Sequence, residues 1–311
     1  MQTNNIWRAL KKTRKIRFGP VAFAFKFERS VNLTSNTRTH WKRASELHRV
    51  WRTKRTKRSD HPQTNSSRGL VTHADDGQQF AVIVGVGPGF GYSLARRLAN
   101  EGIGVVLVSR NAQHLDDLVL EIRESGGFAC AYGCDATSET SVLDLFSLVG
   151  KAHGVPHLVV YSLQNFGPGL VMDIEVPAFE DGWKHNCLGS FLVARSAARM
   201  MSPSGRGSII LVGSTSSIIG RAGHLNLAAG KFGQRAIAQV LARELWPVGI
   251  HVAHLLIDAD ISENDSEGDL GTSSDPKQIA EAVVSIHRQP KTAWTSEMDI
   301  RPWNEQFWEH C

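Results

Sequence analysis

The sequence predicts a doubly wound α/β fold, in which a parallel β-sheet lies between two layers of helices. Three observations support this prediction: short apolar runs alternate with stretches of helical periodicity, a glycine-rich turn joins the first run to the first helix, and 41% of the 311 residues are hydrophobic. Alternation of this kind is typical of parallel sheets, because the crossover between two parallel strands needs a long connection, usually a helix. Ligands of such sheets bind at the carboxyl ends of the strands.

Each expected element follows from the pattern of its own residues. Continuous apolar runs indicate strands that are buried on both faces. They cover residues 81–84, 104–109, 128–134, 157–161, 208–212 and 250–257. Apolar residues spaced three and four apart indicate helices over about 92–102, 114–124, 141–151, about 179–201, about 226–245 and 276–288. Pro276 suits the first turn of the last helix, because its missing N–H has no intrahelical partner there.

The turn between the first strand and the first helix is the most informative local motif. It contains Gly85, Gly87, Gly89, Phe90 and Gly91. Glycine is needed where a side chain would keep the backbone away from a pyrophosphate, and the free amides at a helix start favour an anion. A strand before and a helix after form the context of a dinucleotide site, whereas an ordinary tight turn is the alternative. We expect these five residues to bind the phosphates of a nucleotide.

Charge divides the chain into a basic arm and an acidic domain. Residues 1–70 carry 18 Lys and Arg against 3 Asp and Glu, and residues 71–311 carry 17 against 27, so their net charges are +15 and −10. The arm has no sustained periodicity, and we expect it to be disordered. Three interpretations stay open: a transit peptide, an arm that binds nucleic acid or an acidic membrane, or a segment absent from the mature protein, with translation starting near Leu70 or Val71.

The cysteines and the hydropathy exclude several classes of protein. The four cysteines have no zinc-finger spacing, so we expect reduced thiols and no metal; they are Cys130, Cys134, Cys187 and Cys311. No apolar stretch approaches the roughly 20 residues that span a bilayer. We therefore expect a cytoplasmic protein, or an organelle-matrix protein if residues 1–70 are a transit peptide.

From about residue 78 to 290 the chain resembles the short-chain dehydrogenase/reductase family in the order and spacing of these segments. The positions that carry the resemblance are the glycine motif Gly85-xxx-Gly89-x-Gly91, Asp135-Ala136, Asn186, Ser214 and Lys231. The resemblance implies a single Rossmann-fold domain that binds a nicotinamide cofactor. It implies Ser214, Lys231 and Asn186 as catalytic residues, Lys231 also as a ligand of the cofactor ribose, and Asp135 with Ala136 as the adenine-side loop.

The end of the second strand bears on the choice of cofactor. An acidic side chain there favours the ribose 2′-hydroxyl of NAD, whereas a basic one accommodates the 2′-phosphate of NADP. This chain has Ser109 and Arg110, and no acid follows before Leu115. The sequence therefore predicts NADP(H) rather than NAD(H), although Arg110 as a solvated loop charge is the alternative.

The resemblance fails at the tyrosine that transfers a proton in the family's usual reaction. That tyrosine stands four residues before the lysine, where this chain has Leu227. Ser214 lies thirteen residues before Leu227, which is the family's usual separation, so the register is sound. Tyr161, at the end of the fourth strand, and His224, seven residues before Lys231, are candidate replacements for the acid. Packing for Tyr161 and solvent exposure for His224 are the alternatives.

These observations predict an NADP(H)-dependent oxidoreductase with an atypical active site. Its substrate would be a small carbonyl, an alcohol or an activated double bond, because an enolate needs mainly a hydrogen-bond donor, which Ser214 can supply. The alternative is a catalytically silent NADP(H)-binding sensor or partner subunit.

The resemblance also implies a homodimer or homotetramer paired through the helices at about 179–201 and 226–245. We expect no membrane partner, and nucleic-acid binding by the arm is the weaker hypothesis. Residues 291–311, with three tryptophans, are expected to be an aromatic tail that packs on the domain near the substrate mouth or against a second subunit.

Overall fold

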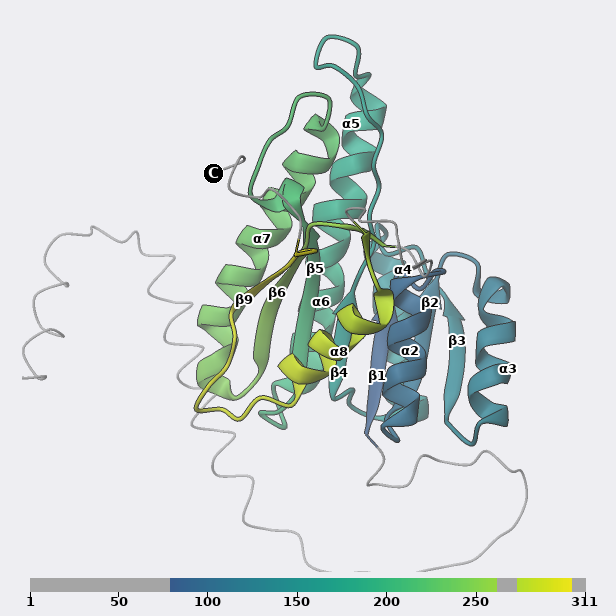
Figure 1. Cartoon of the computed structure of the whole chain (residues 1–311). Coiled ribbons are helices and arrows are strands. Elements are labelled where there is room, and N and C mark those ends of the chain that lie inside the picture. Colours follow the sequence, from purple (N-terminus) through teal and green to yellow (C-terminus); the bar gives the residue numbers. More distant parts are fainter. Residues whose placement is uncertain (1–78, 262–272, 304–311) are drawn as a thin grey trace, which may run out of the picture. The chain divides into compact units, whose positions relative to one another are not determined.

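The computed structural model describes residues 79–261 and 273–303. Its main sheet contains seven strands, all parallel, in the order β3-β2-β1-β4-β5-β6-β9 (Figure 1). The strands are β1 Phe80–Val84, β2 Gly104–Ser109, β3 Ala129–Gly133, β4 Leu158–Tyr161, β5 Ser208–Ser214, β6 His251–Ile257 and β9 Glu297–Ile300. The strand order reverses between β1 and β4, which is the crevice where doubly wound sheets bind ligands. The predicted Rossmann fold is confirmed.

Alternate residues of the strands face two helical layers. Ala81 and Ile83 of β1 belong to one core cluster, and Val82 and Val84 belong to the other. The first layer contains α2 (Phe90–Asn100), α3 (Asp116–Glu124) and α8 (Pro276–His287). The second contains α4 (Glu139–His153), α6 (Gly189–Met201) and α7 (Leu225–Leu245). Because both faces are covered, the central strands β1, β2 and β4 are apolar along most of their length rather than alternating, as the sequence indicated.

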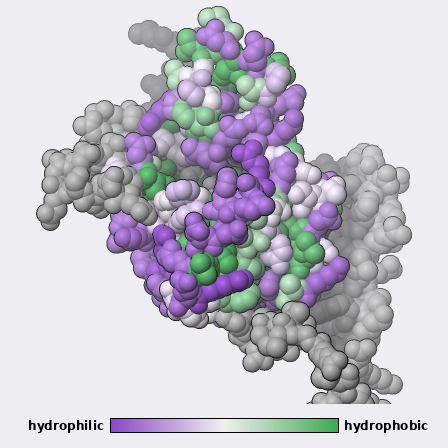
Figure 2. Space-filling model, turned by 90° about the vertical axis from the view of Figure 1, so that its right-hand side faces the viewer, coloured by the Kyte–Doolittle hydropathy of each residue, from purple (hydrophilic) through white to green (hydrophobic). Residues whose placement is uncertain are grey.

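Short elements connect these layers. The 3₁₀ turns are η2 (Ala112–Leu115), η4 (Thr215–Ser217) and η5 (Trp246–Val248), and β7 (Asp260–Ile261) pairs with β8 (Ser273–Ser274). None of the helices in the described ranges combines the length and apolar character that crossing a membrane requires. Figure 2 shows a mainly hydrophilic surface on one side of the molecule, with hydrophobic groups at the upper end, the level at which Figure 1 places α5 (Val176–Trp183).

The long helix expected over about 179–201 is a continuous helical run in the structure, but it contains a π-helical turn that was not expected. Helix α5 continues into η3 (Lys184–Leu188) and then into α6. In η3 the N–H of Gly189 bonds to the carbonyl of Lys184, five residues back, so the carbonyl of His185 loses its usual partner. Hydrophobic periodicity does not reveal the interruption, since one extra residue per turn leaves the apolar face nearly continuous.

Within the tail expected at 291–311, Trp294 stacks on His251, and residues 297–300 form the unexpected strand β9 beside β6. The register pairs His254 with Glu297 and Ile257 with Ile300. Polar side chains hold the strand in place: Arg235 of α7 forms two hydrogen bonds of 2.7 Å with Glu297, and Glu297 lies 3.0 Å from Nδ1 of His254. Burial lowers the pKa of His254 to about 4, despite the neighbouring carboxylate. The expectations for residues 1–70, and for the part of the tail at 304–311, concern residues outside the described ranges.

Candidate functional site

A cavity of about 790 Å³ opens at the carboxyl ends of β1, β4, β5 and β6. Several segments that are far apart in the sequence line it: the glycine turn, the loop after β4, the end of β5, the start of α7 and the residues after β6. The lining residues include Gly85, Gly87, Phe90, Gly91, Ser162, Gln164, Phe166, Ser214, Thr215, Arg221, His224, Leu227, Lys231 and Asp258. Topology explains this gathering, because parallel strands bring their carboxyl ends to one edge.

The glycine turn has the geometry of a phosphate cradle. Gly85 and Gly89 have φ values of 94° and 83°, which L side chains rarely adopt. A Cβ added at Gly87 would meet nothing within 4 Å, whereas one at Gly91 would lie 3.0 Å from Cα of Val86. Helix α2 begins here with no capping side chain, so its first amides can serve an anion. The turn therefore fits a nucleotide diphosphate.

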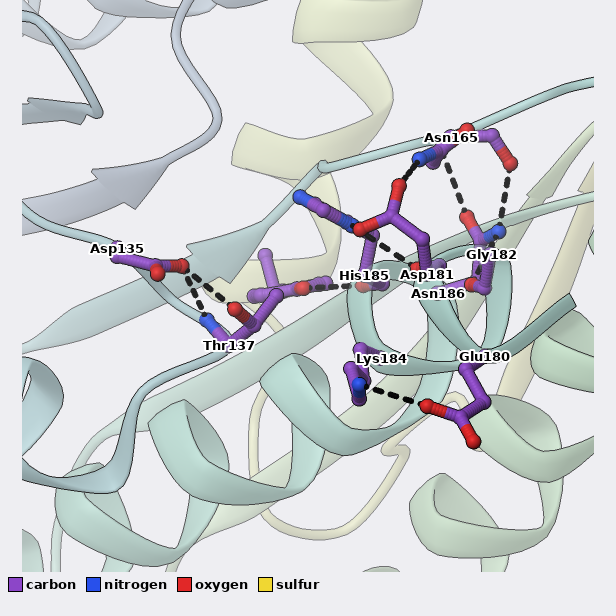
Figure 3. Close-up of polar contacts among 10 residues, drawn as sticks. Asp135, Thr137, Asn165, Glu180, Asp181, Gly182, Lys184, His185 and Asn186 are labelled. Atoms are coloured by element: carbon purple, nitrogen blue, oxygen red, sulfur yellow. Dashed lines mark hydrogen bonds and ion pairs between the residues drawn. The ribbon is translucent and has the colours of Figure 1, made fainter. Parts of the chain in front are cut away.

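The four residues expected at the adenosine end lie along the neighbouring ends of β2 and β3, outside the cavity lining. Ser109 donates to the carbonyl of Asn111 at 2.6 Å, and Arg110 is exposed. Asp135 accepts two hydrogen bonds from Thr137, at 2.9 and 2.7 Å (Figure 3), and these lower its pKa. Ala136 is buried. Arg110 is near enough to contribute to the low pKa of Asp135, so the two side chains share one edge of the sheet.

Lys231 is buried beneath the cavity with 1% of its surface exposed. Its Nζ donates to the carbonyls of Val212 and Leu163, at 2.9 and 3.3 Å, and to Oε1 of Gln234 at 3.3 Å. Burial lowers its pKa from 10.5 to about 7, because the low-polarity surroundings disfavour the charged form. The ammonium is therefore held at one position by acceptors from β5 and from the loop after β4.

Ser214 and Leu227 occupy neighbouring parts of the same wall. Ser214 is the last residue of β5 and caps η4, where its Oγ accepts from the backbone N–H of Ser217. Its hydroxyl proton has no acceptor within the part of the chain that the structure describes. Leu227 lies one helical turn before Lys231 in α7, with 4% of its surface exposed. The wall thus presents a hydroxyl that can still donate a hydrogen bond, beside an aliphatic side chain and a buried amine.

Asn186 acts on the loop after β4 rather than on the cavity itself. The side chain is fully buried in η3 and does not line the cavity. Its Oδ1 accepts from the N–H of Asn165 at 3.1 Å, and its Nδ2 donates to the carbonyls of Asn165 and Gly182 at 2.7 and 2.9 Å (Figure 3). Asn165 also donates to Asp181. These contacts fix the loop that carries Gln164 into the cavity wall.

Of the two candidate acids, only His224 lines the cavity. Its ring packs against Phe166 with the centroids 4.8 Å apart. Tyr161 is fully buried in the core layer formed by α4, α6 and α7. Its hydroxyl donates to the carbonyl of His185 that the π turn leaves free. Burial raises the pKa of Tyr161 far above its usual value. The structure therefore agrees with the interpretation of Tyr161 as a packing residue of the core.

An ion pair beside the cavity was not expected from the sequence. Asp258, directly after β6, accepts a hydrogen bond from Thr215 and pairs with Arg301. Arg301 also forms two hydrogen bonds with Asp299, at 2.9 and 3.0 Å. Arg301 reaches this position only because β9 joins the sheet, and hydrophobic periodicity does not predict that strand. Within the described ranges no group of three or more His, Cys, Asp or Glu side chains is arranged to hold a metal ion.

This Rossmann fold is a nucleotide-binding fold of oxidoreductases, and the comparisons identify the family. The family model for short chain dehydrogenases matches residues 79–259. The chain belongs to the short-chain dehydrogenase family and is an oxidoreductase of that type. Sorbitol-6-phosphate 2-dehydrogenase of Escherichia coli (strain K12) is 35% identical over 182 residues, which cover 58% of this chain and 70% of that protein.

Other relatives extend the match over most of their own length. An uncharacterized oxidoreductase of Staphylococcus aureus (strain N315) is 26% identical, covering 72% of this chain and 97% of that protein. The crystal structure of a short-chain dehydrogenase from Rhodopseudomonas palustris is 32% identical with a TM-score of 0.66, covering 72% of this chain and 99% of that one. A metagenomic short-chain oxidoreductase in complex with NADP shares the fold, at 24% identity and a TM-score of 0.65, covering 73% of this chain and 98% of that one.

Proposed function

We propose that this protein is an NADP(H)-dependent oxidoreductase that acts on a small carbonyl compound, an alcohol or an activated double bond. The observation that carries the proposal is the cavity, which brings the glycine turn together with Ser214, Leu227 and Lys231. The nicotinamide nucleotide would supply or accept the hydride. The chain would contribute the binding of that nucleotide, the orientation of the substrate and the transfer of a proton.

The nucleotide site divides into a phosphate part and an adenosine part. The open space at Gly87 and the uncapped start of α2 support binding of the diphosphate. The exposed guanidinium of Arg110 supports a 2′-phosphate, and Asp135 would accept a hydrogen bond from the adenine amino group. Dissociation constants for NADPH and NADH test this choice: we expect tighter NADPH binding, and an Arg110→Glu variant should reverse the preference. Equal affinities in the unmodified protein would contradict it.

Three residues would act at the substrate end. Ser214 would donate a hydrogen bond to the substrate oxygen, because its hydroxyl accepts from Ser217 but donates to no acceptor among the described residues. Lys231 would donate a hydrogen bond to the cofactor ribose in place of one of its two 3.3 Å contacts, with Leu163 or Gln234. Asn186 would position the loop after β4. Hydrogen-bond donors fixed in place before the reaction stabilise developing negative charge without reorganisation.

Leu227 in place of the proton donor implies slow carbonyl reduction, or a different acid. General acid catalysis contributes about 10²- to 10⁴-fold, so its loss weakens turnover without abolishing hydride transfer. His224 lies in the cavity wall and is the candidate acid that the geometry favours. Reduction of an activated double bond depends less on an acid, and Ser214 would suffice as the donor to the enolate oxygen.

The test of the proposed function is a Leu227→Tyr variant assayed against small aldehydes, ketones and enones with NADPH. A tyrosine at this position of α7 would point into the cavity four residues before Lys231. We expect carbonyl reduction to increase by about 100-fold or more, in line with the contribution of an acid. A Leu120→Tyr variant is the control, because Leu120 is exposed on α3. No gain in Leu227→Tyr would contradict an otherwise complete site.

A second candidate function is NADP(H) sensing without turnover. The buried Leu227 favours it, because an aliphatic side chain closes the position from which a proton would come. Binding of NADPH by a protein that oxidises none of it, with His224→Gln leaving that result unchanged, would support the sensor.

The assay panel also includes sorbitol 6-phosphate with NADP and NAD, since an Escherichia coli relative bears that substrate in its name.

Assembly into a homodimer or homotetramer is proposed as well. Phe191 of α6 and Phe232 and Val240 of α7 expose apolar side chains on the two helices expected to pair. Light scattering of the purified protein measures its mass, and a monomer at micromolar concentration would contradict this assembly.

A further inference from the structure

The wall of the cavity contains an arginine with no acidic partner among the described residues. Arg221 lies between η4 and α7, and its Nε and Nη2 atoms are buried without a hydrogen-bond acceptor in that part of the chain. Guanidinium N–H groups that are removed from water and left unpaired cost free energy. A ligand that brings acceptor oxygens to Arg221 removes that cost.

Main-chain contacts brace the turn that carries this side chain. His224 donates its N–H to the carbonyl of Arg221 at 3.2 Å. Gly169, in the loop after β4, donates to the carbonyl of Gly223 at 3.0 Å and forms an isolated parallel bridge with His224. The ring of Phe166 packs on His224 from the same loop. The guanidinium is therefore attached to a supported turn beside the loop that closes one side of the cavity.

Within the described ranges, the charges that line the cavity leave this cation uncompensated. Asp258 lines the cavity, but it already accepts from Thr215 and pairs with Arg301. Asp260 is exposed, so water and salt screen its charge. Lys231 has three acceptors of its own and adds no negative charge. A small anion is the ligand that this arrangement fits best.

We propose that Arg221 binds an anionic group of the substrate, either a carboxylate or a phosphate monoester, on the side of the cavity next to His224. The planar guanidinium presents paired N–H groups that match two oxygens of such an anion. The reacting carbon would lie farther in, near Ser214 and Lys231. This inference rests on the proposed oxidoreductase function and adds the substrate class to it.

The test is calorimetry with small non-reacting probes, so that binding is measured without turnover. Succinate and inorganic phosphate represent the two anions, and succinamide is the neutral match of succinate. Each probe is titrated into the full chain, with and without NADPH, for the unmodified protein and for Arg221→Gln. Arg206→Gln is the matched control, because Arg206 is exposed and lies outside the cavity lining. Circular dichroism establishes that both variants are folded.

Succinate or phosphate should bind at least about tenfold more weakly to Arg221→Gln, because the variant loses the charge-assisted hydrogen bonds of the guanidinium; tenfold corresponds to about 1.4 kcal/mol. Succinamide binding should not change, and Arg206→Gln should behave like the unmodified protein. The tighter of the two anions identifies the substrate group.

Equal anion binding with and without Arg221 would overturn the inference, as would a loss of NADPH affinity in Arg221→Gln, because the arginine would then serve the cofactor. Failure of the unmodified protein to bind NADPH would instead contradict the proposed function, and the anion titrations without NADPH would still report on Arg221.

Discussion

Replacing Lys231 with methionine should stabilise the protein and weaken its function at the same time. Burial lowers the pKa of Lys231 from 10.5 to about 7. Between these two values the unfolded chain holds a proton that the folded chain lacks, so stability rises with pH across this window. Below pH 7 the folded protein carries the full cost of the buried ammonium, and above pH 10.5 the cost disappears.

The size of the effect follows from the same values. Each pKa unit corresponds to about 1.4 kcal/mol, so the fall from 10.5 to about 7 costs about 5 kcal/mol well below pH 7. At pH 7 the cost is about 4 kcal/mol, because half of the folded molecules have already lost the proton. Methionine removes this cost and also the hydrogen bonds to Leu163, Val212 and Gln234, which offsets about 1–2 kcal/mol. The unfolding free energy of Lys231→Met should therefore increase by about 2–3 kcal/mol at pH 7 and should show no increase near pH 10.5.

Urea unfolding at both pH values measures this difference, and an NADPH titration measures the function. Lys277→Met is the control, because Lys277 is exposed at the start of α8 and should change stability little at either pH. The NADPH affinity of Lys231→Met should fall, since the amine would no longer hold the ribose. If Lys231→Met lost stability at pH 7, or gained the same amount at both pH values, the buried amine would not be the cause of the cost.

Three further predictions concern stability. In Gly230→Ala the new Cβ would lie 2.5 Å from Cβ of Asn186, so we expect a loss of about 1–3 kcal/mol in urea unfolding, whereas Gly220→Ala, with nothing within 4 Å, should be nearly neutral; equal losses would contradict the contact. Burial lowers the pKa of His254 from 6.5 to about 4, so the unfolding free energy should fall by about 3 kcal/mol as the pH falls through that window. If the unfolding free energy of His254→Asn depended on pH as that of the unmodified protein does, this would argue against the assignment. Tyr161→Phe should lose about 1–2 kcal/mol of unfolding free energy, because a π-turn carbonyl loses its partner, while NADPH-dependent activity stays the same; a loss of activity alone would restore Tyr161 as a candidate acid.

The sheet was predictable because its central strands are buried on both faces and therefore read as apolar runs. Strand β9 was not, since Glu297-Met298-Asp299-Ile300 is half polar and its partners are distant in sequence. Its Glu297 is stabilised by Arg235 and His254, and neither contact leaves a local pattern. The role of Asp258 escaped prediction for the same reason, because Arg301 approaches it only through β9.

The gathering of the glycine turn with Ser214, Leu227 and Lys231 followed from spacing and topology together. Strand ends and helix starts meet at one edge of a parallel sheet, and their order along the chain determines which residues share it. The structure differs in finer points. Asn186 contacts the loop at Asn165 rather than the cavity, because a π turn rotates it inward. That Nε and Nη2 of Arg221 find no acceptor among the residues described here depends on burial, which no sequence pattern reports.

We expect the glycine turn to hold the diphosphate of NADP(H). Calorimetry with NADPH on the unmodified protein and on Gly87→Glu measures this binding. A side chain at Gly87 has open space, so the variant should fold with unchanged stability, while its carboxylate occupies and repels the phosphate site. We predict that the unmodified protein binds NADPH and that the variant binds it at least about 100-fold more weakly, which corresponds to about 2.7 kcal/mol. Binding of neither NADPH nor NADH at millimolar concentration by the unmodified protein, or equal binding by the variant, would contradict the claim.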